Sequence, residues 1–75
     1  MNKQQRQRLA EIVGQLNDAL YEIESMKDDE ECKYDNLPEQ WQDGQKGEQL
    51  QEGIDALDDV LSYLGDAIDS LEQIC

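Results

Sequence analysis

The sequence predicts an all-α protein: an antiparallel two-helix hairpin with heptad packing that dimerises into a four-helix bundle. In two long stretches, apolar residues recur at alternating intervals of four and three, so they share one side of an α-helix that must be buried. About three positions in each heptad are apolar, which is typical of bundles, whereas a two-stranded coiled coil needs only two. Two such helices cannot bury both faces against each other, so we expect a second copy to complete the core.

The length limits the chain to one small domain. At 75 residues, with no Phe, one Trp and 37% hydrophobic residues, a lone compact monomer would be marginally stable. We therefore treat residues 1–75 as a single helical-hairpin domain.

The first helix is expected over residues 4–27. Its core stripe is flanked by Ile12, Ala19 and Met26. The stripe consists of Leu9, Val13, Leu16, Leu20 and Ile23.

A polar connector is expected over residues 28–45. It opens with an acidic run at 28–31, which the macrodipole disfavours at a helix end, so we expect the first helix to stop there. Pro38 and Glu39 favour the start of a short helical turn within 37–42. Leu37 and Trp41, four residues apart, are expected to close the hairpin end together with Tyr34.

The second helix is expected over residues 46–75. Its pattern, with Val60, Ala67 and Ile74 beside the stripe, repeats that of the first helix at an offset of 48 residues, so both follow one packing rule. The stripe consists of Leu50, Ile54, Leu57, Leu61, Leu64, Ile68 and Leu71, and ends at Cys75.

The charge is strongly acidic, with 19 Asp and Glu against six Lys and Arg and a net charge of −13. Direct nucleic-acid binding and binding to an anionic membrane both need clustered cations, so both are disfavoured, whereas the charge permits either a cationic partner or simply high solubility. Three of the cations, Lys3, Arg6 and Arg8, lie at the start of the chain. In an antiparallel hairpin we expect them beside the carboxylates of Asp66, Asp69 and Glu72.

Neither a secretory signal nor a membrane span is recognisable, so a cytoplasmic location is expected. Cys32 and Cys75 have no metal-binding or redox spacing. In the hairpin they would lie ~40 Å apart, beyond the reach of a disulfide.

Catalysis is not expected. There is no His, hence no Ser-His or Cys-His pair, and there is no glycine-rich phosphate loop. Carboxylates do occur at helical spacing, as in Asp55 and Asp59, but on solvent-facing positions, so we interpret them as a solvated face. No cofactor and no metal site are expected.

The connector carries a family resemblance. Residues 35–39 (Asp-Asn-Leu-Pro-Glu), 41–42 (Trp-Gln) and 44–48 (Gly-Gln-Lys-Gly-Glu) resemble small acidic helical-hairpin proteins of phages and prophages of Gram-positive bacteria, in which a similar connector joins two acidic helices. The resemblance covers nearly the whole chain. It implies a phage context, with the host cytoplasm as location, and implies no mechanism.

Two functional hypotheses remain. In the first, the protein is a non-catalytic interaction module that blocks or regulates a basic host protein, since a hairpin ~45 Å long would carry about one charge per 3.5 Å, close to a single DNA strand. In the second, it is a structural self-assembly element of a phage or bacterial complex. The candidate partner contacts are Tyr34, Leu37, Trp41, Asp55, Asp59 and Asp66.

Overall fold

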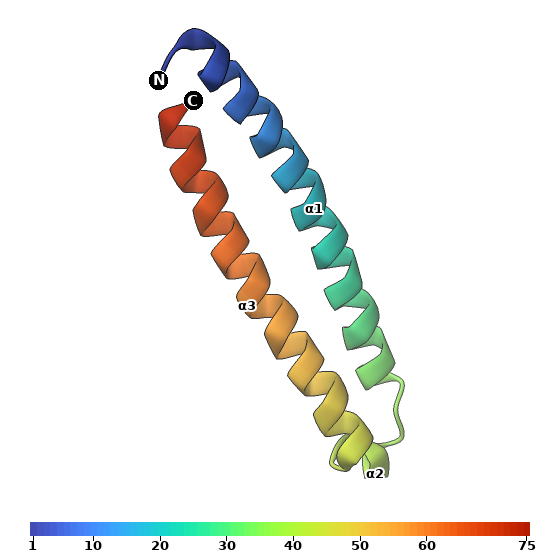
Figure 1. The fold of residues 1–75 in the computed structure, drawn as a ribbon. Helices are drawn as coiled ribbons and strands as arrows, with labels where there is room; N and C mark the ends of the chain where they lie inside the picture. Colours follow the sequence, from blue (N-terminus) through green and yellow to red (C-terminus); the bar gives the residue numbers. More distant parts are fainter.

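Two long helices, α1 (Lys3–Asp35) and α3 (Gln45–Ile74), pack side by side and antiparallel in the computed structural model, which describes residues 1–75 (Figure 1). A one-turn helix, α2 (Glu39–Gln42), lies in the connector between them. The molecule is a rod whose Cα atoms extend over 58 × 14 × 12 Å. The helical hairpin that the heptad pattern predicts is confirmed.

The expected end of the first helix near residue 27 is wrong, because α1 continues to Asp35. Lys27, Glu30 and Tyr34 keep the four-and-three spacing of the core stripe and are half-buried. Lys27 and Lys33 form ion pairs with carboxylates of the acidic run, which offset its unfavourable position near a helix end. The connector is therefore much shorter than the expected 28–45.

Both ends of α1 are capped. At its start, Asn2 and Gln5 form a reciprocal capping box, in which each side chain accepts a hydrogen bond from the other residue's backbone N–H. At its end, the side-chain amide of Gln42 in α2 donates hydrogen bonds to the carbonyl oxygens of Tyr34 and Leu37, both at 3.2 Å. These contacts tie the short helix to the end of the long one.

The turn into α3 depends on Gly47, which is buried. A Cβ atom on this residue would lie only 1.9 Å from the carbonyl oxygen of Gln42. Only glycine allows this approach of α2 to α3 without a backbone shift. The approach fixes where α3 begins beside α1.

The core is thin. Only Val13, Ile54 and Ile68 are buried hydrophobic residues, and no side chain is completely enclosed. The other members of the two predicted stripes are half-buried along the helix–helix interface. Cys75, at the end of the second stripe, is exposed.

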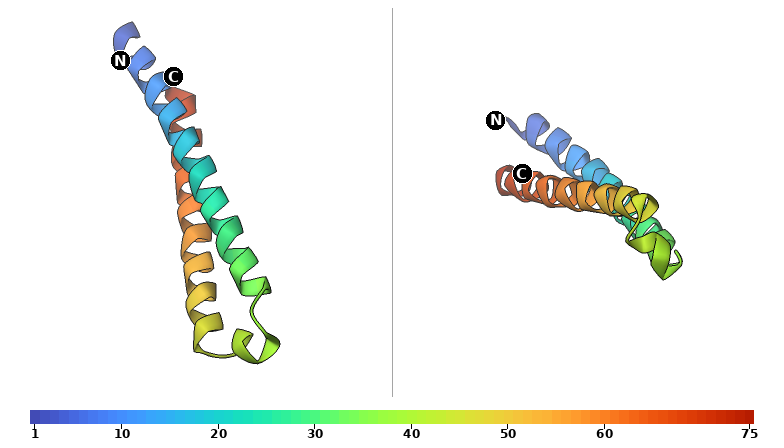
Figure 2. Two further views of the ribbon diagram at one scale, coloured as in Figure 1. Left: turned by 90° about the vertical axis from the view of Figure 1, so that its right-hand side faces the viewer. Right: turned by 90° about the horizontal axis from the view of Figure 1, so that it is seen from below.

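The start of α1 extends past the end of α3 (Figure 2). Lys3 and Arg6 take part in no ion pair, and Arg8 pairs with Glu11 of its own helix at 3.0 Å. The expected contacts of these cations with Asp66, Asp69 and Glu72 are therefore wrong. The connector sets a helix register that carries the first turns of α1 beyond the last residue of α3.

Candidate interaction surface

Acidic side chains cover one side of α3. Relative to the core stripe they occupy three neighbouring heptad positions, which span roughly 100° of arc, and all are exposed. This acidic face consists of Glu48, Glu52, Asp55, Asp58, Asp59, Asp66, Asp69 and Glu72. It includes the three aspartates that the sequence singled out as partner contacts, so the structure places all three on one surface of one helix.

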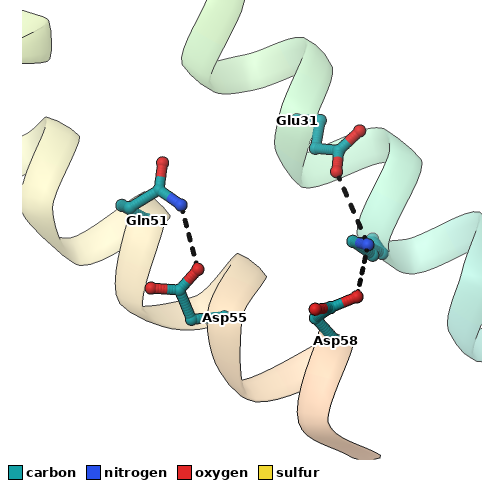
Figure 3. A network of polar contacts seen from close by, with 5 residues as sticks. Glu31, Gln51, Asp55 and Asp58 are labelled. Carbon is teal, nitrogen blue, oxygen red and sulfur yellow. Dashed lines mark hydrogen bonds and ion pairs between the residues drawn. The ribbon is translucent and has the colours of Figure 1, made fainter. Parts of the chain in front are cut away.

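One cluster of polar contacts links the acidic face to α1 (Figure 3). The amine of Lys27 donates a hydrogen bond of 2.8 Å to Asp58 across the helix–helix interface and lies 3.8 Å from the carboxylate of Glu31. The hydrogen bond to Asp58 raises the pKa of Lys27 above its ordinary value of 10.5, and Glu31 adds to the effect. On the same side of α3 as Asp58, the side-chain amide of Gln51 donates a hydrogen bond of 3.0 Å to the carboxylate of Asp55.

Most of the carboxylates have no cationic partner. Of the 19 acids, only Glu11, Glu30, Glu31 and Asp58 take part in ion pairs. Glu30 is half-buried, and the other 18 acids are exposed. The surface therefore presents fifteen carboxylates whose field is not neutralised by an ion pair within the chain. Such a surface attracts cationic groups at a range limited by salt.

The connector end does not form the expected plug. Tyr34 and Leu37 are half-buried there, and Gln42 brings their carbonyl groups together. Trp41, by contrast, is 47% exposed, with the amine of Lys46 at 4.8 Å from its ring centroid, a cation–π contact. Trp41 points away from the helix pair because Gln42, not Trp41, occupies the side of α2 that faces the end of α1.

Trp41 and Lys46 border a shallow hollow of about 240 Å³, which Gln40, Gly44 and Gln45 complete. A half-exposed tryptophan at the tip of a rod is a suitable anchor for a protein partner. The structure thus supports Trp41 as an accessible candidate contact, and it places Trp41 apart from the three aspartates of the acidic face.

Sequence reasoning found only three members, Val60, Ala67 and Ile74, of a second stripe on α3. Its members are spaced by four, three, four, three and four residues, carry no charge and are all exposed. They are Ala56, Val60, Tyr63, Ala67, Ser70 and Ile74. The sequence signal for the whole stripe is the pair Ala56 and Tyr63, because these two residues extend the apolar residues beside the core stripe into a second continuous stripe.

Flanking residues of α1 continue this surface. Glu31 and Asp58 each follow a core position by one residue, and the Lys27 contacts place them on one edge of the interface. Ile12, Ala19 and Met26 instead precede core positions by one residue and therefore lie along the opposite edge, as do Val60, Ala67 and Ile74. Together with the second stripe of α3, these three residues of α1 form the apolar face.

No group of three or more His, Cys, Asp or Glu side chains is arranged to hold a metal ion, and no helix has an apolar stretch sufficient to cross a bilayer. Both cysteines are free and exposed, Cys32 toward the connector and Cys75 at the opposite end of the rod. No protein-family model, curated protein or solved structure matches the chain.

Proposed function

We propose that this protein is a non-catalytic, phage-type interaction module that uses its acidic surface to bind, and so block or regulate, a basic protein in the host cytoplasm. The observation that carries the proposal is the set of fifteen exposed carboxylates without an ion-pair partner. Large surface fields of a single sign are usually avoided by interspersing both signs of charge. Here one helix concentrates a single sign on one side.

Charge density supports a nucleic-acid-binding enzyme as the target. Over 58 Å the net charge of −13 gives about one charge per 4.5 Å of rod, somewhat sparser than expected because the rod is longer than 45 Å. We further propose that two hairpins associate into a four-helix bundle. A dimer of equal length would carry about one charge per 2.2 Å, close to the 1.7 Å of duplex DNA.

Competition with DNA tests this proposal. The tagged protein is incubated with bacterial lysate, and captured proteins are eluted with a salt gradient and, separately, with duplex DNA. We expect a nucleic-acid-binding enzyme that both treatments release, and whose binding to labelled duplex the protein inhibits less as salt rises. Retention of no such enzyme, or an inhibition that salt does not weaken, would contradict the proposal.

Matched neutralisations localise the contact. One variant carries Asp55→Asn, Asp59→Asn and Asp66→Asn on the acidic face of α3. Its control removes the same charge from exposed residues of α1 with Glu11→Gln, Asp18→Asn and Glu22→Gln. We expect the α3 variant to lose more affinity for the basic target than the control, whereas equal losses would indicate attraction by net charge alone.

A second function, a structural self-assembly element, is favoured by a different observation, the exposed apolar face. Burial of apolar surface is insensitive to salt or strengthened by it. Self-association without any basic partner, unchanged or tighter at high salt, would support this alternative.

A further inference from the structure

We propose that the apolar face is the dimer interface and that a second copy of the hairpin docks on it in antiparallel orientation, with α1 against α1 and α3 against α3. The inference rests on the dimer that forms part of the proposed function and adds its face and orientation. Three independent features of the chain support it: the surface area, the distribution of side-chain size, and the charge at the two ends of the rod.

The surface area fits a single partner of this size. The chain exposes 5678 Å², about 1,000 Å² more than the ~4,700 Å² expected for a compact protein of its mass. A stable interface of standard size buries about 800 Å² on each partner. On α3 the apolar face contains no charge from Gly53 to Ile74, so two chains of net charge −13 meet where their mutual repulsion is weakest.

Side-chain size along the face is symmetric, as an interface between identical copies requires. The Lys27–Asp58 contact sets the register of the hairpin and defines three levels across the face. In order from the connector these are Met26 with Val60, Ala19 with Ala67, and Ile12 with Ile74. The central level has the smallest side chains, so a two-fold axis there lets the helices of the two copies approach closely. The same axis sets the level of Met26 and Val60 against the partner's level of Ile12 and Ile74.

The antiparallel orientation also pairs the small residues and the charges outside the centre. With the axis at Ala19 and Ala67, Tyr63 lies within one residue of the level of the partner's Ser70, which leaves room for its ring. On α1, Arg8 lies within one residue of the level of the partner's Asp29, and both are one helical step outside the apolar residues. Arg8, the last of the three cations at the start of α1, thus meets the acidic run at 28–31 that precedes the connector.

A parallel dimer lacks this complementarity. It would place α1 on the partner's α3 and bring both connector ends together. Arg8 would then lie beyond the last residue of the partner's α3, and Asp29 would lie level with the uncharged Ala56 and Leu57. Only the antiparallel arrangement sets these opposite charges against each other, so the charge pattern selects it.

Sedimentation equilibrium with Ala67→Glu tests the face. The substitution sets two carboxylates against each other at the two-fold axis, and we expect the dissociation constant to rise roughly 100-fold or more. Ser62→Glu adds the same charge at an exposed position of α3 outside the face and should leave the dimer within about threefold of wild type. Circular dichroism confirms that both variants remain helical. A monomeric wild type, or equal loss in both variants, would overturn the inference.

Charge exchange and cross-linking test the orientation. Arg8→Glu and Asp29→Arg should each weaken the dimer by roughly tenfold, and the double variant should restore it. Lys3→Glu, on the other edge of α1, should have little effect.

Cross-linking tests the orientation a second time. In a Cys32→Ser, Cys75→Ser background, Ala67→Cys should oxidise to a covalent dimer by itself. A disulfide that forms only when Ala67→Cys is mixed with Ala19→Cys would show a parallel dimer and overturn the orientation. None of these measurements involves a basic target, so their failure is distinguishable from failure of the proposed function.

Discussion

At the scale of single residues, the hairpin depends on a few positions whose roles differ from the sequence expectation. Gly47 is required for the approach of two backbones, whereas a Cβ on Gly14 would meet no side chain and no other helix within 4 Å. Lys27 occupies a core position of the heptad and pairs with Asp58. A charged group at such a position specifies helix register at some cost in stability.

The glycines give the first prediction. Gly47→Ala should destabilise the protein by about 1–3 kcal/mol, because its methyl group would overlap the backbone of Gln42. The control, Gly14→Ala, should stabilise it by about 0.5–1 kcal/mol through helix propensity alone. Urea denaturation measures both, and two changes of the same sign would contradict the backbone approach.

Lys27 gives a prediction about pH. Because the folded state raises the pKa of Lys27, its ion pair contributes fully at neutral pH and is lost as the pH rises through that raised value, above about 10.5. The stability difference between wild type and Lys27→Gln should therefore be constant near neutral pH and shrink above 10.5. Lys33→Gln, which removes only a pair within α1, is the control and should show a smaller difference. The midpoints of urea unfolding are compared among the three proteins at each pH. The effect of tyrosine ionisation on stability is common to all three and is removed by this comparison.

At the scale of elements, contacts at the C-terminal end of α1 determine the length of this helix. Gln42 of α2 binds the carbonyl groups of Tyr34 and Leu37, and Asn36 closes the helix with its own backbone N–H. Residues 28–35 are therefore helical despite an acidic run that favours fraying in isolation. A tertiary contact from the following element outweighs the local preference.

Removal of that contact is the third prediction. Gln42→Ala should cost about 1 kcal/mol or more, since the partly buried carbonyl group of Leu37 loses its side-chain donor and that of Tyr34 keeps only backbone donors. Hydrogen exchange of the amides in the last two turns of α1 should speed up while the middle of the helix is unaffected. Gln40→Ala, an exposed change in the same short helix, is the control. Unchanged exchange at the end of α1 would show that Gln42 does not hold it.

At the scale of the whole molecule, electrostatic repulsion opposes a thin core. Four ion pairs act against a net charge of −13, and three buried hydrophobic residues provide little enclosed core. The rod is therefore sensitive to ionic strength and to any partner that covers its apolar face.

Salt dependence is the fourth prediction. Raising the NaCl concentration should raise the melting temperature of the protein, because screening of repulsion among carboxylates outweighs screening of the ion pairs. Thermal unfolding at fixed protein concentration measures the effect. Sodium sulfate at equal ionic strength separates screening from strengthened apolar burial, which sulfate enhances further. A melting temperature that falls with NaCl would show that the ion pairs dominate.

By itself, the sequence determined the helical class, the two core stripes and the acidic surface, since helical spacing alone assigns a residue such as Ile54 or Asp59 to a side of its helix. The tertiary structure alone decided the end of α1 at Asp35, the outward position of Trp41 and the isolation of Lys3 and Arg6 from their expected partners. These features depend on the register between helices, which is fixed by contacts between residues far apart in the chain, Gln42 with Tyr34 and Lys27 with Asp58. A periodic pattern specifies which sides of two helices meet, whereas their relative displacement along the axis is set by the connector and the few contacts that cross the interface.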